Sequence, residues 1–96
     1  MLTGKQKRHL RSLAHHEKAI FQVGKSGVGH NMIDQLNDAL EKRELIKVAI
    51  LQNCMEDKED VAEQIKEGTG AEIVQIIGSN IVLYKESVEN KQINLP

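Results

Sequence analysis

Helix-like and strand-like segments alternate along this chain, and their order limits the folds that it can adopt. Apolar residues recur at helical spacing in three segments, and at alternate positions or in short β-type runs in four others. Helices are predicted over 4–16, 31–43 and 58–67, and strands over 19–23, 45–51, 72–77 and 81–85. The order α-β-α-β-α-β-β predicts an α+β fold, an α/β sandwich with a mixed four-stranded sheet.

The two faces of the predicted sheet differ. Crossover connections favour the second and third helices on one face. The other face is expected to carry Gln22, Lys47 and Gln75 among Ala49, Leu51, Ile73 and Ile77. Because this mixture is too apolar to be fully exposed, we expect the first helix or a bound partner to cover part of it.

Length and composition indicate one domain, residues 1–96, with a polar tail at 87–96 that is either packed along the domain or disordered. No apolar run approaches the ~18 residues of a membrane span, and the first residues lack the apolar core of a signal peptide. The single cysteine, Cys54, cannot form an internal disulfide. We therefore expect a cytoplasmic protein with no cofactor and no membrane association.

The net charge of −1 conceals an uneven distribution of charge. Residues 1–30 contain six basic residues and one acidic residue, a charge of +5, together with all four histidines. Residues 31–96 contain seven basic and thirteen acidic residues, a charge of −6. An almost neutral chain can therefore present a strongly positive face, which would suit a polyanion.

The first predicted helix has a thin apolar stripe and a broad basic face. Thr3 is its expected N-cap. On a helical wheel, Leu10, Leu13, Ala14 and Gln6 cluster on one side. The candidate binding residues on the other side are Lys5, Lys7, Arg8, Arg11 and His15. We expect the helix to pack with one side and to offer the other to a partner.

A glycine-flanked turn, Gly24-Lys25-Ser26-Gly27, joins the first strand to the second helix. Two glycines permit backbone conformations that other residues avoid, and they let a sugar–phosphate backbone approach closely. The turn amides and the following helix N-terminus attract anions, while Lys25 adds a charge and Ser26 a hydroxyl donor. GxxG loops of this kind clamp nucleotide backbones, so these four residues predict an RNA-phosphate site.

Other chemical interpretations have less support. Gly24-Lys25-Ser26 matches the end of a Walker A motif, but the motif requires glycine where this chain has Ala19. The histidines lack the i, i+3 or i, i+4 spacing of a helical metal site, and no serine has a recognisable partner base. We expect neither an enzyme nor a metal site.

Phe21 and Tyr84 are the only aromatic residues, and both lie in predicted strands where burial is expected. A platform that stacks single-stranded bases needs more exposed rings. Binding through phosphates and shape is therefore expected, with structured RNA rather than DNA as the partner.

Several motifs extend over the chain in a fixed order. They are Lys5-Gln6-Lys7-Arg8, Val23-Gly24-Lys25-Ser26-Gly27, Glu44-Leu45-Ile46-Lys47-Val48, Gln75-Ile76-Ile77-Gly78 and Leu95-Pro96. Together they resemble the YhbY-like proteins, the stand-alone bacterial form of the CRM domain, named for chloroplast RNA splicing and ribosome maturation. The resemblance implies a fold like the C-terminal domain of bacterial translation initiation factor three, with an added N-terminal helix.

The resemblance also implies association with ribosomal RNA in precursors of the large ribosomal subunit, as an assembly factor. Its RNA-contacting residues map onto Gly24, Lys25, Ser26 and Gly27, and its basic helical face onto Lys5, Lys7, Arg8 and Arg11. One alternative stays open, a protein-interaction module whose acidic second and third helices dock on basic ribosomal proteins.

Overall fold

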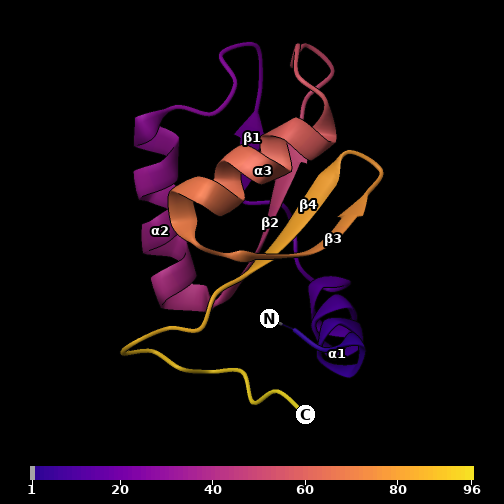
Figure 1. The fold of residues 1–96 in the computed structure, drawn as a ribbon, viewed down its shortest axis with the longest axis vertical. Coiled ribbons are helices and arrows are strands. Elements are labelled where there is room, and N and C mark those ends of the chain that lie inside the picture. The colour runs from indigo at the N-terminus through magenta and orange to yellow at the C-terminus, as the bar shows by residue number, and fades with distance from the viewer. Residues whose placement is uncertain (1) are drawn as a thin grey trace.

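A four-stranded sheet lies between two helical layers in the computed structural model, which describes residues 2–96 (Figure 1). The elements are α1 (Gly4–Ala14), β1 (Phe21–Val23), α2 (His30–Arg43), β2 (Leu45–Ile50), α3 (Lys58–Thr69), β3 (Glu72–Ile77) and β4 (Asn80–Tyr84). The strand order is β1-β2-β4-β3, with β1 parallel to β2 and the other neighbours antiparallel. The predicted α+β sandwich with a mixed sheet is confirmed. None of the helices within residues 2–96 is long and apolar enough to cross a membrane.

The larger core lies between the sheet and the layer formed by α2 and α3. Its buried residues are Val23, Leu36, Leu40, Ile46, Val48, Val61, Ala62, Ile65, Ala71, Ile81 and Leu83. The two helices approach closely where residue 68 is glycine, because a Cβ there would lie 2.6 Å from Cδ1 of Ile33. α3 ends at Thr69, and its C-cap is Gly70, whose φ of +75° is the left-handed conformation that glycine adopts freely.

α1 covers the opposite face of the sheet. The sequence predicted that either this helix or a bound partner would cover part of that face. Leu10 and Ala14 are buried there, in a smaller core with Leu45, Val74, Val82 and Tyr84. Leu13 was expected in the same apolar stripe, but it stays 38% exposed. The apolar stripe is therefore narrower than the wheel indicates, and most of the helix surface faces solvent.

The ends of α1 follow from local chemistry. The Thr3 hydroxyl accepts a hydrogen bond from the Gln6 amide (3.1 Å), and the Gln6 side chain accepts one from the Thr3 amide (3.0 Å). This capping box satisfies two N–H groups that a helix leaves free, so the predicted N-cap is confirmed. The helix ends at Ala14 with His15 as its C-cap, slightly earlier than predicted.

A β-bulge in β3 changes which residues share a face. Ile73 pairs with Leu83 and Gln75 pairs with Val82, so Val74 is an extra residue between them. Ile73 consequently packs against the core of α2 and α3. The prediction that placed Ile73 on the opposite face was wrong, because strict alternation does not allow for a bulge.

The segment at 87–96 lies along the domain, held by two carboxylates near the end of α2. Glu44 accepts hydrogen bonds from the backbone amides of Ser87 (2.8 Å), Gln92 (2.6 Å) and Ile93 (2.8 Å). Glu41 accepts them from the Ser87 hydroxyl (2.7 Å) and from the amides of Val88 and Glu89 (both 3.0 Å). We call Glu41 and Glu44 the tail-binding carboxylates.

These donors change the acidity of both groups. The Ser87 hydroxyl, followed by the amides of Val88 and Glu89, lowers the pKa of Glu41 from 4.5 to about 2. Burial acts to raise the pKa of Glu44, but its three amide donors outweigh burial and leave that pKa lowered. Both side chains are therefore negatively charged acceptors at neutral pH.

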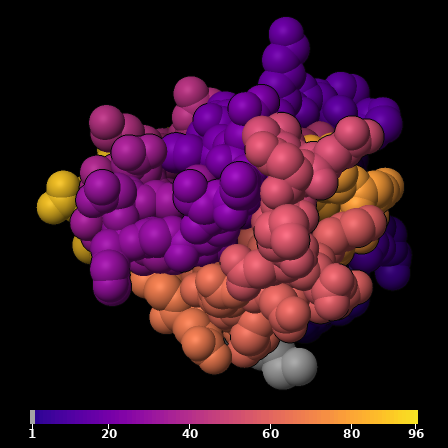
Figure 2. Space-filling view, turned by 90° about the horizontal axis from the view of Figure 1, so that it is seen from above, coloured from indigo at the N-terminus to yellow at the C-terminus, as the bar shows by residue number. Residues whose placement is uncertain are grey.

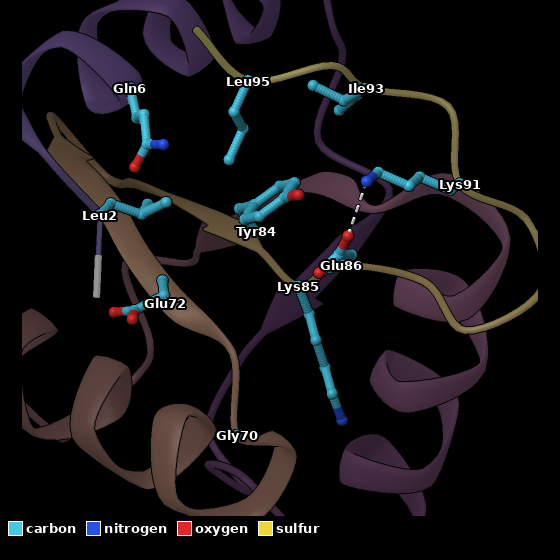
Figure 3. A pocket seen from close by; sticks show the side chains of 10 residues that line it. All are labelled: Leu2, Gln6, Gly70, Glu72, Tyr84, Lys85, Glu86, Lys91, Ile93 and Leu95. Carbon is cyan, nitrogen blue, oxygen red and sulfur yellow. Dashed lines mark ion pairs between the residues drawn. The ribbon is translucent and has the colours of Figure 1, made fainter.

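Beyond these bonds, the tail covers the ring of Tyr84. Figure 3 shows Tyr84 beneath the tail residues Ile93 and Leu95, and an ion pair of 3.0 Å joins Lys91 to Glu86. The Gln6 side chain of α1 donates to the Pro96 carbonyl (3.3 Å). The tail thus connects the end of α2 to the start of α1 across the end of the sheet at which β4 finishes.

Candidate nucleic-acid interface

The segment Gly24–Gly27, which we call the glycine loop, follows β1 at the upper end of the sheet in Figure 1. The Gly27 amide donates to the Gly24 carbonyl (3.0 Å) and closes a tight turn. Within residues 2–96, the amides of Lys25 and Ser26 have no hydrogen-bond acceptor, and both side chains are exposed. The loop therefore presents free N–H donors beside an ammonium group, which is the chemistry that holds a phosphate oxygen.

The N-terminus of α2 lies directly after this loop. Its N-cap is Gly29, which offers no side-chain acceptor to the first turn. At this end the Ile33 amide donates a hydrogen bond to the Gly29 carbonyl (3.1 Å). The earlier N–H groups of the first turn point out of the helix, and the helix dipole adds partial positive charge there.

The two glycines of the loop have different structural roles. Gly27 has a φ of +67°, which favours glycine, and a Cβ there would lie 2.5 Å from Oε2 of Glu56. Gly24 lies outside the positive-φ region, so only Gly27 uses the backbone freedom that the sequence offers at both glycines. A Cβ on Gly24 would meet Oδ1 of Asn53 at 3.4 Å, which is a close but tolerable contact.

Residues 51–57, between β2 and α3, form a second loop beside the glycine loop. Figure 2 looks onto it and shows the violet residues that follow β1 beside the pink residues that follow β2. Glu56 lies against Gly27 and accepts a hydrogen bond from the Gln64 side chain. No sequence motif points to Glu56, because its place beside the glycine loop results from the packing of two loops.

The predicted basic helix lies on another part of the molecule. α1 packs on β2, β3 and β4, at the lower right of Figure 1, whereas the glycine loop lies at the top. Arg11 and His15 line a hollow together with Lys47, and Lys7 lines a second hollow with Lys66. Lys5 and Arg8 are exposed. The predicted site residues thus form two separate groups, the loop and the helix.

Charge is divided between the two helical layers. α1 contains four cationic residues and no acidic residue. The outer faces of α2 and α3 expose Asp34, Asp38, Glu59, Asp60, Glu63 and Glu67. α2 and α3 also contain Lys42, Arg43, Lys58 and Lys66, so both signs of charge occur in that layer, whereas α1 carries positive charge alone and is the side that favours a polyanion.

Fold and site together define a small α+β domain with an anion-attracting loop and one basic face. The family model of the CRS1 / YhbY (CRM) domain matches residues 2–85. The chain belongs to this family, and the resemblance seen in its motifs is confirmed.

Relatives cover the whole chain. The Bacillus subtilis protein named "Probable RNA-binding protein YqeI" is 68% identical over 96 residues, all of both chains. A Haemophilus influenzae protein named "RNA-binding protein" is 38% identical over 99% of this chain and 95% of its own length. The solution structure of SAV1595 from Staphylococcus aureus is 61% identical, covers 100% of both chains and superposes with a TM-score of 0.83.

Proposed function

We propose that this protein is a non-catalytic RNA-binding module that associates with ribosomal RNA in precursors of the large ribosomal subunit and acts in its assembly. The observation that carries RNA binding is the glycine loop, where the amides of Lys25 and Ser26 are free and the Lys25 ammonium is exposed. Relatives over the full length are named as RNA-binding proteins, and the assembly role follows from the family resemblance.

In this proposal the two basic groups contact different stretches of one folded RNA. The loop holds a phosphate through Lys25 and the backbone amides, while Lys5, Lys7, Arg8 and Arg11 contact phosphates along the α1 face. The acidic outer faces of α2 and α3 fix the orientation, because they repel the same RNA.

Salt dependence of binding tests the phosphate contacts. Lys25→Ala combined with Arg8→Ala should weaken binding to a structured ribosomal RNA fragment and reduce the slope of log affinity against log salt by roughly one to two units. The matched control is Lys42→Ala with Arg43→Ala, which removes one lysine and one arginine from the last turn of α2. Equal effects of the two double variants would contradict the proposed surface.

Cross-linking in cells, followed by sequencing of the attached RNA, tests the ribosomal part. Recovery of large-subunit precursor RNA is expected, and recovery of scattered messenger RNA alone would overturn it. Association with ribosomal particles that survives nuclease treatment would instead favour docking on ribosomal proteins.

A further inference from the structure

A groove of about 450 Å³ lies between α1 and the sheet, apart from the glycine loop. Its helical wall carries Arg11 and His15, and its sheet wall carries Lys47, Gln75 and Asn80. Ala14 and Val82 are buried beneath the groove, and Ile77, which is 53% exposed, gives it an accessible apolar side. This volume lies within the ~300–1,000 Å³ range of small-ligand sites.

Strand pairing explains why these side chains converge. Lys47 pairs with Val82, which pairs with Gln75, so the three lie in one row across β2, β4 and β3. The next row contains Ala49, Asn80 and Ile77. Residues directly opposite in antiparallel strands share a face, and here that face is the one on which α1 packs.

The groove offers positive charge and unused hydrogen-bonding groups. Its lining includes the basic side chains of Arg11 and Lys47 and the imidazole of His15, and no acidic residue. Within residues 2–96, the side chains of Arg11, Lys47, Gln75 and Asn80 make no hydrogen bond or ion pair. Lys47, Gln75 and Asn80 are partly buried, and their polar atoms keep access to solvent, so each can exchange water for a ligand.

These groups have the chemistry needed to bind a single nucleotide. Guanidinium and ammonium groups bind phosphate oxygens. A carboxamide has both donor and acceptor atoms, so it can pair with a base edge. The exposed side chain of Ile77 can pack against the face of the base. A base inside a duplex cannot reach such a groove, because its pairing edge is occupied and its faces are stacked.

The groove also lies within reach of the glycine loop. Gln22 pairs with Ala49, and Ala49 pairs with Asn80, so the row that borders the groove extends to β1. Two strand spacings separate Gln22 from Asn80, roughly 10 Å. Gln22 is exposed and precedes the loop in sequence by two positions. One RNA strand can therefore contact both places.

We propose that this groove binds a single unpaired nucleotide of the RNA held at the glycine loop. Arg11 and Lys47 contact its phosphate, while Gln75 and Asn80 read its base edge. The proposal rests on the proposed RNA-binding function and adds a specific preference to it, namely for structured RNA that contains a bulged or flipped-out base.

The test compares an RNA hairpin with the same hairpin carrying one bulged A, C, G or U in its stem. Wild-type protein should bind at least one bulged RNA about tenfold more tightly than the unbulged hairpin, which is the effect of roughly two hydrogen bonds. Gln75→Ala with Asn80→Ala should abolish this preference and leave the salt slope unchanged, because both amides are neutral. The matched control is Gln35→Ala with Asn37→Ala on α2, which should keep the preference.

A second measurement locates the nucleotide directly. Titration of ¹⁵N-labelled protein with each nucleoside 5′-monophosphate should shift the side-chain amide resonances of Gln75 and Asn80 more than those of Gln35 and Asn37. Circular dichroism and thermal unfolding establish that each variant is folded.

The two proposals fail in different ways. If the wild-type protein binds all hairpins equally, and Lys25→Ala with Arg8→Ala weakens that binding, the groove proposal is overturned and RNA binding stands. If no RNA is bound at all, the proposed function itself fails. Loss of the preference in the α2 control, or groove resonances that shift with an oligoglutamate peptide and not with any nucleotide, would also overturn the groove proposal.

Discussion

The glycine loop and the tail use the same chemistry, backbone N–H groups facing an anion, with opposite outcomes. At the tail, the amides of Ser87, Gln92 and Ile93 donate to Glu44, an anion of the same chain. At the glycine loop, the amides of Lys25 and Ser26 have no acceptor within the described residues. An internal anion makes the first arrangement part of the fold, whereas the second is left to bind an anion from outside.

Glu56 falls between these two cases. It belongs to the chain, and it lies against Gly27, but its carboxylate accepts a hydrogen bond from the Gln64 side chain and not from the loop amides. Its charge therefore adjoins the loop without satisfying the loop amides. It should oppose a phosphate that approaches from solvent.

The largest expected effect comes from removing the carboxylate that holds the tail. Glu44→Ala should lower the free energy of unfolding by about 3 kcal/mol, because three amides lose a charged acceptor at a buried position. Urea denaturation measures the change. Glu67→Ala, which removes an exposed carboxylate from α3, should change stability by less than about 0.5 kcal/mol. A stable Glu44→Ala variant with unchanged tail amide resonances would show that the tail is held by other contacts.

The next effect concerns the loop backbone. Gly27→Ala should cost about 1–2 kcal/mol, because its φ of +67° is unfavourable for a residue with a Cβ. Gly24→Ala should cost less, since Gly24 has no positive φ and the nearest contact of a Cβ would be 3.4 Å. Thermal unfolding of both variants gives the difference. Equal losses would mean that the two glycines have equivalent roles after all.

A smaller effect should appear in RNA affinity. Glu56→Gln keeps the shape of the side chain and removes the charge beside the glycine loop, so affinity should rise roughly two- to fivefold at low salt and less at high salt. Fluorescence anisotropy at two salt concentrations measures it. Glu89→Gln removes the same charge from the tail and should leave affinity nearly unchanged. An equal gain in both variants would reflect net charge and not the place of Glu56.

The last prediction concerns acid, which should weaken the tail contacts and leave the protein unaffected at neutral pH. The pKa of Glu41 is lowered to about 2 and that of Glu44 is also lowered, so the unfolded chain takes up these protons more readily than the folded one. Their contribution to stability is complete above the ordinary value of 4.5 and is lost as pH falls towards about 2.

NMR measures this loss of the tail contacts separately from any change at the glycine loop. Between pH 4.5 and about 2, the amide signals of Val88 and Glu89 should move while those of Lys25 and Ser26 stay in place. Glu41→Gln should remove much of the movement at Val88 and Glu89. Simultaneous movement of all four signals would indicate global unfolding and would end the distinction between the two regions.

Local signals in the sequence predicted the elements well. Thr3 indicated the start of α1 as its N-cap, and the strand-like runs at 72–77 and 81–85 indicated β3 and β4 to within one residue. The sequence alternation failed at Ile73, because the bulge at Val74 has no local signature. It also could not show that the basic helix and the glycine loop lie apart.

The sequence alone determined the element order, the class of fold, the family and the separation of positive from negative charge along the chain, because each depends on residues close in sequence or on composition. Tertiary structure decided the rest. The bonds from the tail to Glu44 join residues 43 to 49 positions apart. The groove of Arg11, Lys47, Gln75 and Asn80 draws on a helix and three strands. Such contacts depend on how distant segments pack, and no short pattern in the chain records that packing.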